Sequence, residues 1–409
     1  MPFTPKVRTL LLCRFNYIVP QTFLADPPGS TMLPALDKHI MESRGAGTQS
    51  SLARGDVIEV QGPAASGKTQ LLYHLAASCI LPREVLVTST DVHAERAVPL
   101  GGWGKSAIVF DCDGRWDITR LHEILLTRLD TSFSKTQLPP RPHKPNSTVS
   151  SIAFDSLSRL HIFRPTSSFQ LAATLVNLPK YHTEKMPNEE IRLLFVDSIS
   201  SFYWEDRWRA EHLGSQKARG SNALGHVLQC LQAFRWSHGP VIVLTNWGLN
   251  PLSSTASSAG STLFFKQHLP TPFPAPFEDY QRPSSGRSNQ LPLNCHLTLP
   301  FTLVAQFESD LRQRGIAGHE GMELQASLRD TRRKEVVHRG EIEGYVRIPR
   351  TGCGEKRNSI GRFRFQILKH DVVTLLPIEA DHETYSKVKV IMLVLVPPFV
   401  QGYEPYPLV

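Results

Sequence analysis

The sequence lacks a long run of apolar residues, which argues against a membrane-spanning segment. Val390 to Val396 is apolar, but these seven residues end at Pro397, whereas a spanning helix needs about 20. Near the other end, Leu10 to Cys13 is too short for the core of a signal peptide. We therefore expect no membrane association, and we interpret 390–396 as a strand or an apolar tail.

Cysteine is also scarce, with six residues in 409, and no two of them form a C-x-x-C pair. Disulfide frameworks and zinc sites use closely spaced cysteines, so neither is expected. A reducing compartment, the cytosol or the nucleus, follows as the default. Acidic residues are outnumbered, because 45 Lys and Arg against 37 Asp and Glu leave a formal net charge of +8. Such a charge suits a polyanionic partner but does not require one.

What the chain does have is a complete phosphate-binding motif, G-x-x-x-x-G-K-[ST]. Its eight residues are Gly62, Pro63, Ala64, Ala65, Ser66, Gly67, Lys68 and Thr69. In this motif backbone N–H groups cradle phosphate oxygens, the lysine reaches the β- and γ-phosphates, and the last hydroxyl helps to hold Mg²⁺. An apolar run at 57–60 precedes the motif and a helical pattern over 70–80 follows it. We therefore expect all eight residues to bind a nucleoside triphosphate.

An acidic residue at the end of another strand completes the predicted site. Four apolar residues precede Asp197, which is typical of a buried strand that ends at an active-site edge. Because Mg²⁺ keeps several waters and takes few protein oxygens, Thr69 and Asp197 are predicted to hold it, partly through water. The ordinary structural alternative for Asp197 is the cap of a following helix.

Hydrolysis would also need a base that positions the attacking water. The apolar run 107–110 leads into Asp111, Cys112 and Asp113. Asp113 is the preferred catalytic residue and Asp111 the second choice. Both could instead be loop acids without a catalytic task.

Short apolar runs alternate with helical patterns, which predicts an α/β fold with a mostly parallel, doubly wound sheet, flanking helices, irregular loops and a tail. The expected strands are 56–61, 106–111, 159–163, 191–196 and 241–245. The expected helices are 70–80, 118–129 capped by Asp117, a helix capped by Ser167 or Ser168 and ending at Leu178, and 222–236.

Composition divides the chain into five parts. They are an N-terminal extension over 1–50, partly disordered; an ATP-binding core over 51–250; a Ser/Pro-rich loop over 251–290; a basic C-terminal part of the core over 291–370; and a tail over 371–409. Within the core, 131–150 is interpreted as a linker and 85–105 as an insertion. In the basic part, Phe363 and Phe365 alternate with arginines. Such a strand either contacts nucleic acid or is an edge strand with solvated arginines.

Four stretches of this sequence resemble the RecA-type recombinases, and more narrowly the eukaryotic recombinase paralogues of homologous recombination. They are Gly55–Glu59, Leu72–Ala76, Cys79–Pro82 and Leu194–Trp204. The most discriminating piece is the aromatic triplet 202–204, and the resemblance covers roughly residues 50–250. It implies a RecA-like P-loop NTPase core that binds ATP and Mg²⁺ through Gly62, Gly67, Lys68, Thr69 and Asp197.

The resemblance also implies a nuclear protein that assembles with other recombinase paralogues, first among them a D-type paralogue, in the repair of DNA double-strand breaks and cross-links. Single-stranded or branched DNA is the further expected partner. In the family a glutamate stands where this chain has Asp113, whose side chain is one methylene shorter. Small misplacements of a catalytic group can cost about 10²-fold, so we expect slow hydrolysis.

At Trp247 the family carries a glutamine that senses the γ-phosphate, and an indole cannot accept a hydrogen bond. The N-terminal part is also short for a full recombinase. These departures favour an ATP-binding assembly subunit with weak or no ATPase activity. A self-sufficient DNA-dependent ATPase and a P-loop phosphotransferase of another class remain as alternatives.

Overall fold

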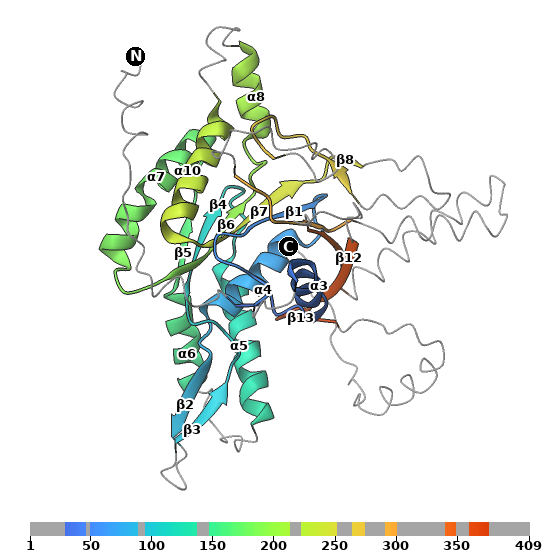
Figure 1. Cartoon of the computed structure of the whole chain (residues 1–409). Helices are drawn as coiled ribbons and strands as arrows, with labels where there is room; N and C mark the ends of the chain where they lie inside the picture. The colour runs from blue at the N-terminus through green and yellow to red at the C-terminus, as the bar shows by residue number, and fades with distance from the viewer. Residues whose placement is uncertain are drawn as a thin grey trace, which may run out of the picture. The chain divides into compact units, whose positions relative to one another are not determined.

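A computed structural model describes residues 29–45, 50–88, 95–136, 147–212, 222–251, 264–274, 291–300, 340–348 and 360–375. Its main sheet consists, from edge to edge, of β5 (Leu160–Phe163), β4 (Ser106–Asp111), β6 (Ile191–Asp197), β7 (Val241–Trp247), β1 (Val57–Gly62), β10 (Cys295–Thr298), β11 (Glu341–Arg347), β12 (Ile360–Ile367) and β13 (Val372–Thr374) (Figure 1). The strands from β5 to β10 are parallel, and β11, β12 and β13 continue the sheet in antiparallel fashion. All five predicted strands are present within two residues of their expected bounds, so the mostly parallel sheet is confirmed.

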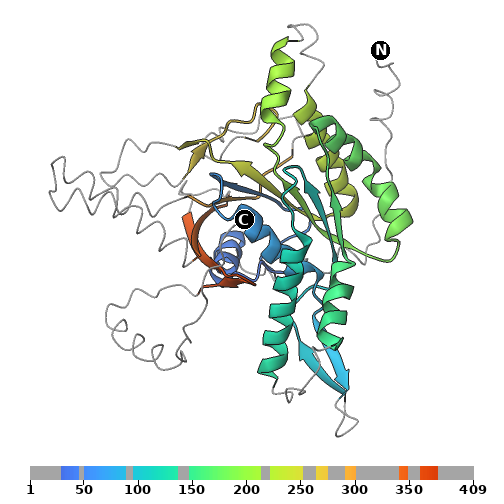
Figure 2. The same cartoon turned by 180° about the vertical axis from the view of Figure 1, so that it is seen from behind.

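Helices cover both faces of this sheet (Figures 1 and 2). One face packs against α3 (Pro34–Arg44), α4 (Lys68–Ile80), α5 (Ile118–Lys135) and α6 (Ser147–Leu157), and the other against α7 (Ser168–Lys185) and α10 (Ala223–His238). Successive side chains of a strand point to opposite faces. Val109 therefore joins the core under α4, whereas Phe110 joins the core under α7. The sheet is doubly wound, as predicted.

Three of the four predicted helix starts are correct within one residue, and α4 begins two residues earlier than expected. Three predicted ends fall short, because α5, α7 and α10 continue to Lys135, Lys185 and His238. Asp117 accepts a hydrogen bond from Thr119 N (2.8 Å), and Ser167 accepts one from Gln170 N (3.2 Å). The helix expected to end at Leu178 continues past Pro179 to Lys185. Proline lacks the N–H of a helical hydrogen bond, but the burial of Leu178 and Pro179 compensates for this loss. Likewise α5 and α6 occupy the two ends of the segment interpreted as a linker.

Smaller elements complete the described part. The segment interpreted as an insertion forms a hairpin of β2 (Glu84–Thr88) and β3 (Glu95–Pro99). A second pair joins β8 (Asn250–Pro251) to β9 (Phe265–Lys266), and α8 (Tyr203–His212) has no buried residue. The strand suggested for 390–396 lies outside the described residues. Among the described helices, none combines the length and the apolar character needed to cross a bilayer.

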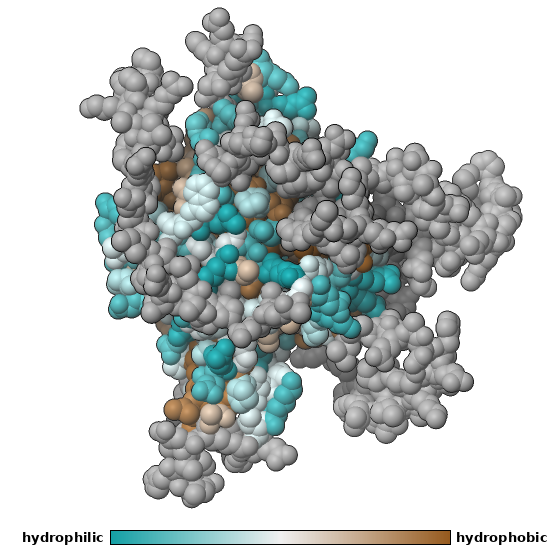
Figure 3. All heavy atoms as spheres, in the orientation of Figure 1, coloured by the Kyte–Doolittle hydropathy of each residue, from teal (hydrophilic) through white to brown (hydrophobic). Residues whose placement is uncertain are grey.

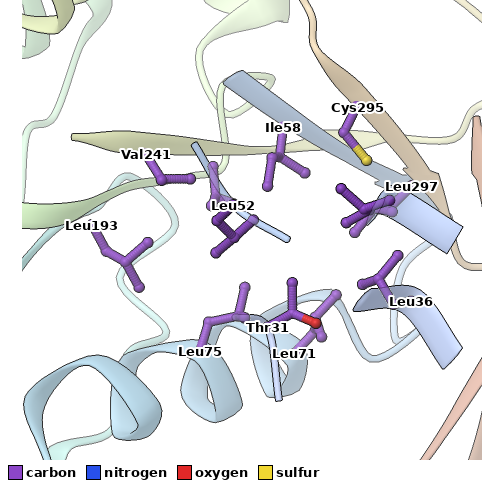
Figure 4. Close-up of a pocket in the computed structure, with 12 residues that line it drawn as sticks. Thr31, Leu36, Leu52, Ile58, Leu71, Leu75, Leu193, Val241, Cys295 and Leu297 are labelled. Carbon is purple, nitrogen blue, oxygen red and sulfur yellow. The ribbon is translucent and has the colours of Figure 1, made fainter. Parts of the chain in front are cut away.

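Residues 34–44 of the predicted N-terminal extension form α3, which is part of the core. Leu36 and Ile40 are buried, and Asp37 accepts hydrogen bonds from the backbone N (2.8 Å) and hydroxyl (2.7 Å) of Thr31. Figure 4 shows aliphatic side chains of α3, α4 and the sheet around a cavity of about 10 Å³. A cavity of this size is at the lower limit for a single water. The helix is therefore closely packed against the sheet.

His74 of α4 links the phosphate-loop helix to two distant segments. Burial and the nearby Arg128 lower the pKa of His74 to about 3, so the ring is neutral. Its Nε2 donates to Thr31 O (3.0 Å), and its Nδ1 accepts from Arg128 Nη2 (2.7 Å). Arg128 also donates to Val372 O (3.2 Å) and pairs with Asp371 (3.3 Å). Segments far apart in the chain are thus joined on one helix.

The aromatic–basic strand is neither an edge strand nor a stacking surface for bases. Phe363 and Phe365 are buried in the core, so their rings are not available to stack on bases. Nor is β12 an edge strand, because it pairs with β11 on one side and β13 on the other. On its opposite face Arg362 pairs with Glu343, and Arg364 pairs with an acidic residue of the same neighbouring strand. The alternation reflects one covered face and one face of ion pairs.

Candidate nucleotide site

The phosphate motif lies where its mechanism requires, between the end of β1 and the start of α4. Gly67 has φ +92°, in the left-handed region that favours glycine. Ala65 also has a positive φ, of 58°. Ser66 N donates to Pro63 O (3.4 Å), which closes a turn. The predicted strand–loop–helix arrangement is therefore present.

The first position of the loop has no room for a residue larger than glycine. A Cβ on Gly62 would lie 2.5 Å from Ser66 Oγ and 2.7 Å from Leu299 O. Within the described part of the chain, Ser66 Oγ is buried and has no hydrogen-bond partner. A tight loop with a spare hydroxyl at a helix N-terminus fits an anionic phosphate.

Lys68 folds back over the loop that carries it. Its Nζ donates to Gly62 O (2.8 Å) and Pro63 O (2.7 Å). Burial lowers its pKa to about 8, although the charges of Asp197 and Asp113 act in the opposite direction. The ammonium group therefore lies among the loop carbonyls and within the field of both predicted acidic residues.

Thr69 and Asp197, the two predicted metal ligands, are in direct contact. Thr69 Oγ1 donates to Asp197 Oδ2 (2.9 Å), and Thr245 Oγ1 donates to Oδ1 (2.6 Å). Burial raises the pKa of Asp197, while these two hydrogen bonds oppose the rise. The hydroxyl and carboxylate oxygens suit Mg²⁺, which needs few protein ligands. Among the residues that the structure describes, no cluster of three or more His, Cys, Asp or Glu side chains forms another candidate metal site.

The two candidate bases differ in their surroundings. Asp113 is exposed, and its Oδ1 accepts a hydrogen bond from the Ser201 hydroxyl. Asp111 is buried and accepts hydrogen bonds from Arg115 N (2.9 Å) and Trp116 N (3.2 Å). Its carboxylate therefore holds a loop in place and is not free to activate water. Asp113 stays the candidate of the two.

Two side chains at Asp197 were not predicted as site residues. Thr245 reaches it from β7, and Trp116 Nε1 reaches its Oδ2 from the loop after β4 (3.2 Å). Alternation along β7 could have placed Thr245 on the nucleotide face, because Val241 and Val243 point to that face. No sequence pattern indicates the Trp116 contact, which joins residues 81 positions apart.

Trp247 ends β7 beside the phosphate loop, paired in register with Gly62. Its ring stacks on His268, with centroids 6.4 Å apart and planes at 11°. Its neighbour Asn246 is on the other face of the sheet, where Nδ2 donates to Glu59 Oε1 (2.6 Å). Burial would raise the pKa of Glu59, but the charge and hydrogen bonds of His296 and further bonds lower it overall. The amide next to Trp247 therefore belongs to a buried network away from Lys68.

Curated proteins named for DNA repair are among those that this chain resembles. The chain is 32% identical over 159 residues to "DNA repair protein XRCC2" of Mus musculus, covering 39% of this chain and 45% of that protein. It is 27% identical over 195 residues to "DNA repair protein XRCC2 homolog" of Arabidopsis thaliana, covering 44% of this chain and 50% of that protein. The chain thus spans about half the length of the curated relatives it matches. No protein-family model matches it.

Proposed function

We propose that the matched part of this chain is an XRCC2-like RecA paralogue with a RecA-like α/β core, and that the protein acts in homologous-recombination repair of DNA. The proposal covers double-strand breaks and cross-links, with the nucleus as the place of action. The observation that carries it is the likeness to two proteins named for DNA repair, together with a phosphate loop in contact with a buried carboxylate.

The proposed ligands of the site are ATP and Mg²⁺. The loop Gly62–Thr69 would hold the phosphates, with Lys68 leaving its carbonyl partners to pair with phosphate oxygens. Thr69 and Asp197 would hold the metal, partly through water. Bound Mg²⁺ supplies positive charge against the triphosphate.

We propose that hydrolysis is weak and that ATP acts mainly as a signal for assembly. The Asp113 carboxylate, the preferred candidate base, is exposed to solvent, and it accepts a hydrogen bond from the Ser201 hydroxyl. The indole of Trp247 lies against His268 and cannot offer the amide that the family uses there. Both features support slow hydrolysis, so that the bound nucleotide would stay in the site for a long time.

The proposed partners are other recombinase paralogues in a hetero-oligomer, with a D-type paralogue first among them. Hydrophobic atoms gather at the surface near the end of the molecule that carries β2 and β3 (Figure 3). Leu86 of β2 and Phe154 of α6 are exposed apolar residues. Exposed apolar surface of this kind is typical of protein interaction sites.

Single-stranded or branched DNA is the second proposed partner. The exposed helix α8 carries Trp204 and Trp208, which are 56% and 60% exposed, together with Arg207 and Arg209. Aromatic rings next to arginines form stacking platforms for unpaired bases. This helix stands out from the sheet in Figures 1 and 2. Its tryptophan rings are accessible for stacking, whereas the phenylalanine rings of β12 are buried.

The test is affinity purification of the tagged full chain from cells treated with a DNA cross-linking agent, followed by mass spectrometry. We expect recombinase paralogues in the purified complex, and we expect Lys68→Ala to lose ATP binding while the chain stays folded. An active homofilament of this chain alone would contradict the assembly proposal. Recovery of no repair protein, before or after damage, would contradict the proposed pathway.

A further inference from the structure

Trp116 directs its indole N–H at the carboxylate that would hold the metal. Its Nε1 lies 3.2 Å from Asp197 Oδ2, which also accepts the Thr69 hydroxyl at 2.9 Å. The other oxygen, Oδ1, accepts the Thr245 hydroxyl at 2.6 Å. An ionised carboxylate has about four lone-pair positions. Three donors therefore leave one position, and their directions determine how the carboxylate is oriented.

The ring of Trp116 is itself held on both sides. It packs edge-on against Tyr73, with centroids 4.6 Å apart and planes at 67°, and lies 6.1 Å from Phe195. The whole side chain is buried. A hydroxyl donor can rotate, but an indole N–H points where the ring points. Of the three donors on Asp197, Trp116 is thus the one whose direction is fixed by packing.

The loop that carries Trp116 is anchored as well. Asp111 accepts the Trp116 backbone N–H (3.2 Å), and Arg164 Nε lies 3.2 Å from the same carboxylate oxygen. Arg164 Nη2 also donates to Trp116 O (3.3 Å). The backbone on either side of the indole is therefore tied to β4 and to the segment after β5.

We propose that Trp116 is a positioning residue for the metal, holding Asp197 in the orientation that accepts a metal-bound water. The inference rests on the proposed nucleotide function, because it concerns the same site. Trp116 does not touch the metal and acts only through Asp197. Partners that orient a metal ligand typically change metal affinity by 10- to 100-fold when they are removed.

The test uses the full chain and Trp116→Phe, which keeps an aromatic ring in the core but removes the N–H. Binding of a fluorescent ATP analogue is measured in EDTA, and Mn²⁺ binding is measured by electron paramagnetic resonance with a non-hydrolysable ATP analogue present. We expect the affinity in EDTA to stay within about twofold of wild type, and the Mn²⁺ affinity to fall roughly tenfold. A purely structural role would change both affinities or neither.

Trp236→Phe is the matched control, because Trp236 is 59% exposed on α10 and its loss should change neither affinity. Arg164→Ala is the second variant, which leaves the indole in place and loosens its loop; we expect Mn²⁺ affinity to fall more than about twofold. Unchanged Mn²⁺ affinity in folded Trp116→Phe overturns the inference. If that variant does not fold, unchanged affinity in Arg164→Ala overturns it. Wild type that binds no nucleotide in either condition contradicts the proposed function instead.

Discussion

At the scale of single residues, Lys68 should make the proposed nucleotide binding depend on pH. Burial lowers its pKa to about 8, and a bound triphosphate would raise it, so binding above that pH requires uptake of a proton. We expect affinity for ATP to be nearly constant below pH 8 and to fall by up to about tenfold per pH unit above it. Titration of a fluorescent nucleotide between pH 7 and 9.5 measures this fall.

Lys68→Arg is the control for this dependence. A guanidinium group stays charged throughout the range, so the variant should bind more weakly but with a flat profile. Without nucleotide, the lowered pKa of Lys68 affects the free energy of unfolding in the opposite direction to its effect on ATP affinity. Between pH 8 and the ordinary lysine value of 10.5 the folded chain has released a proton that the unfolded chain keeps, so stability rises with pH. Wild-type affinity that stays constant up to pH 9.5 would contradict the prediction.

Asp113 offers a second test at this scale. Asp113→Glu adds the methylene that the recombinase family has at this position, and the longer carboxylate should reach a water nearer the phosphates. We expect ATP turnover to rise by about tenfold or more, since a positioned base contributes 10²- to 10⁴-fold. Phosphate release under single-turnover conditions measures the change. Asp113→Asn should lower any residual turnover, and equal rates for all three proteins would remove Asp113 from the chemistry.

At the scale of elements, α3 is an integral part of the core. Leu36 is fully buried beside a cavity of about 10 Å³. Because its neighbours are closely packed, they cannot easily move to fill the space that a smaller side chain would leave. Leu36→Ala should lower the free energy of unfolding by about 2–5 kcal/mol. Urea denaturation followed by circular dichroism measures this loss. Met41→Ala on the exposed side of the same helix is the control and should stay within about 0.5 kcal/mol of wild type.

The elements also show what the sequence could predict. Strands such as β4 and β6 were predictable because buried parallel strands are continuous apolar runs with polar ends. Leu36 and Ile40 of α3 and its N-cap residue Leu33 lie at helical spacing, so the pattern was present in the sequence. The helix also packs against β12, which lies far along the chain. The alternation in β12 predicts a strand without revealing which face is covered. Only the tertiary structure decides that.

The candidate site divides in the same way. Its motif residues have fixed local spacing, so the phosphate loop and Asp197 could be found from sequence. Trp116 and the burial of Asp111 depend on how loops from different strands meet at one edge of the sheet. Hydrogen bonds across such sequence distances have no local pattern, and they are the part of the site that the sequence left open.

At the scale of the whole molecule, the net charge of +8 and the aromatic helix α8 should make separable contributions to the proposed DNA binding. Charge determines how steeply the affinity for DNA falls with salt concentration, whereas stacking of bases on aromatic rings adds affinity that salt changes little. Trp204→Ala with Trp208→Ala should weaken binding of single-stranded DNA by about 1–3 kcal/mol per stacked base and leave the salt slope unchanged. Fluorescence anisotropy at several salt concentrations measures both quantities. Trp236→Ala should bind like wild type, and a double variant that also binds like wild type would exclude α8.

His74 and Arg128 give the phosphate-loop helix a further property. His74 contacts the backbone of Thr31, and Arg128 contacts both His74 and the backbone of Val372. A displacement of either backbone segment would therefore also shift α4, the helix that begins at Lys68. By thermodynamic reciprocity, a partner that binds one of these segments and a nucleotide that binds the loop influence each other's affinity whenever they shift α4 differently. Nucleotide bound at the phosphate loop would then protect the segments around residues 31 and 372 from proteolysis, even though the nucleotide and the partner do not touch.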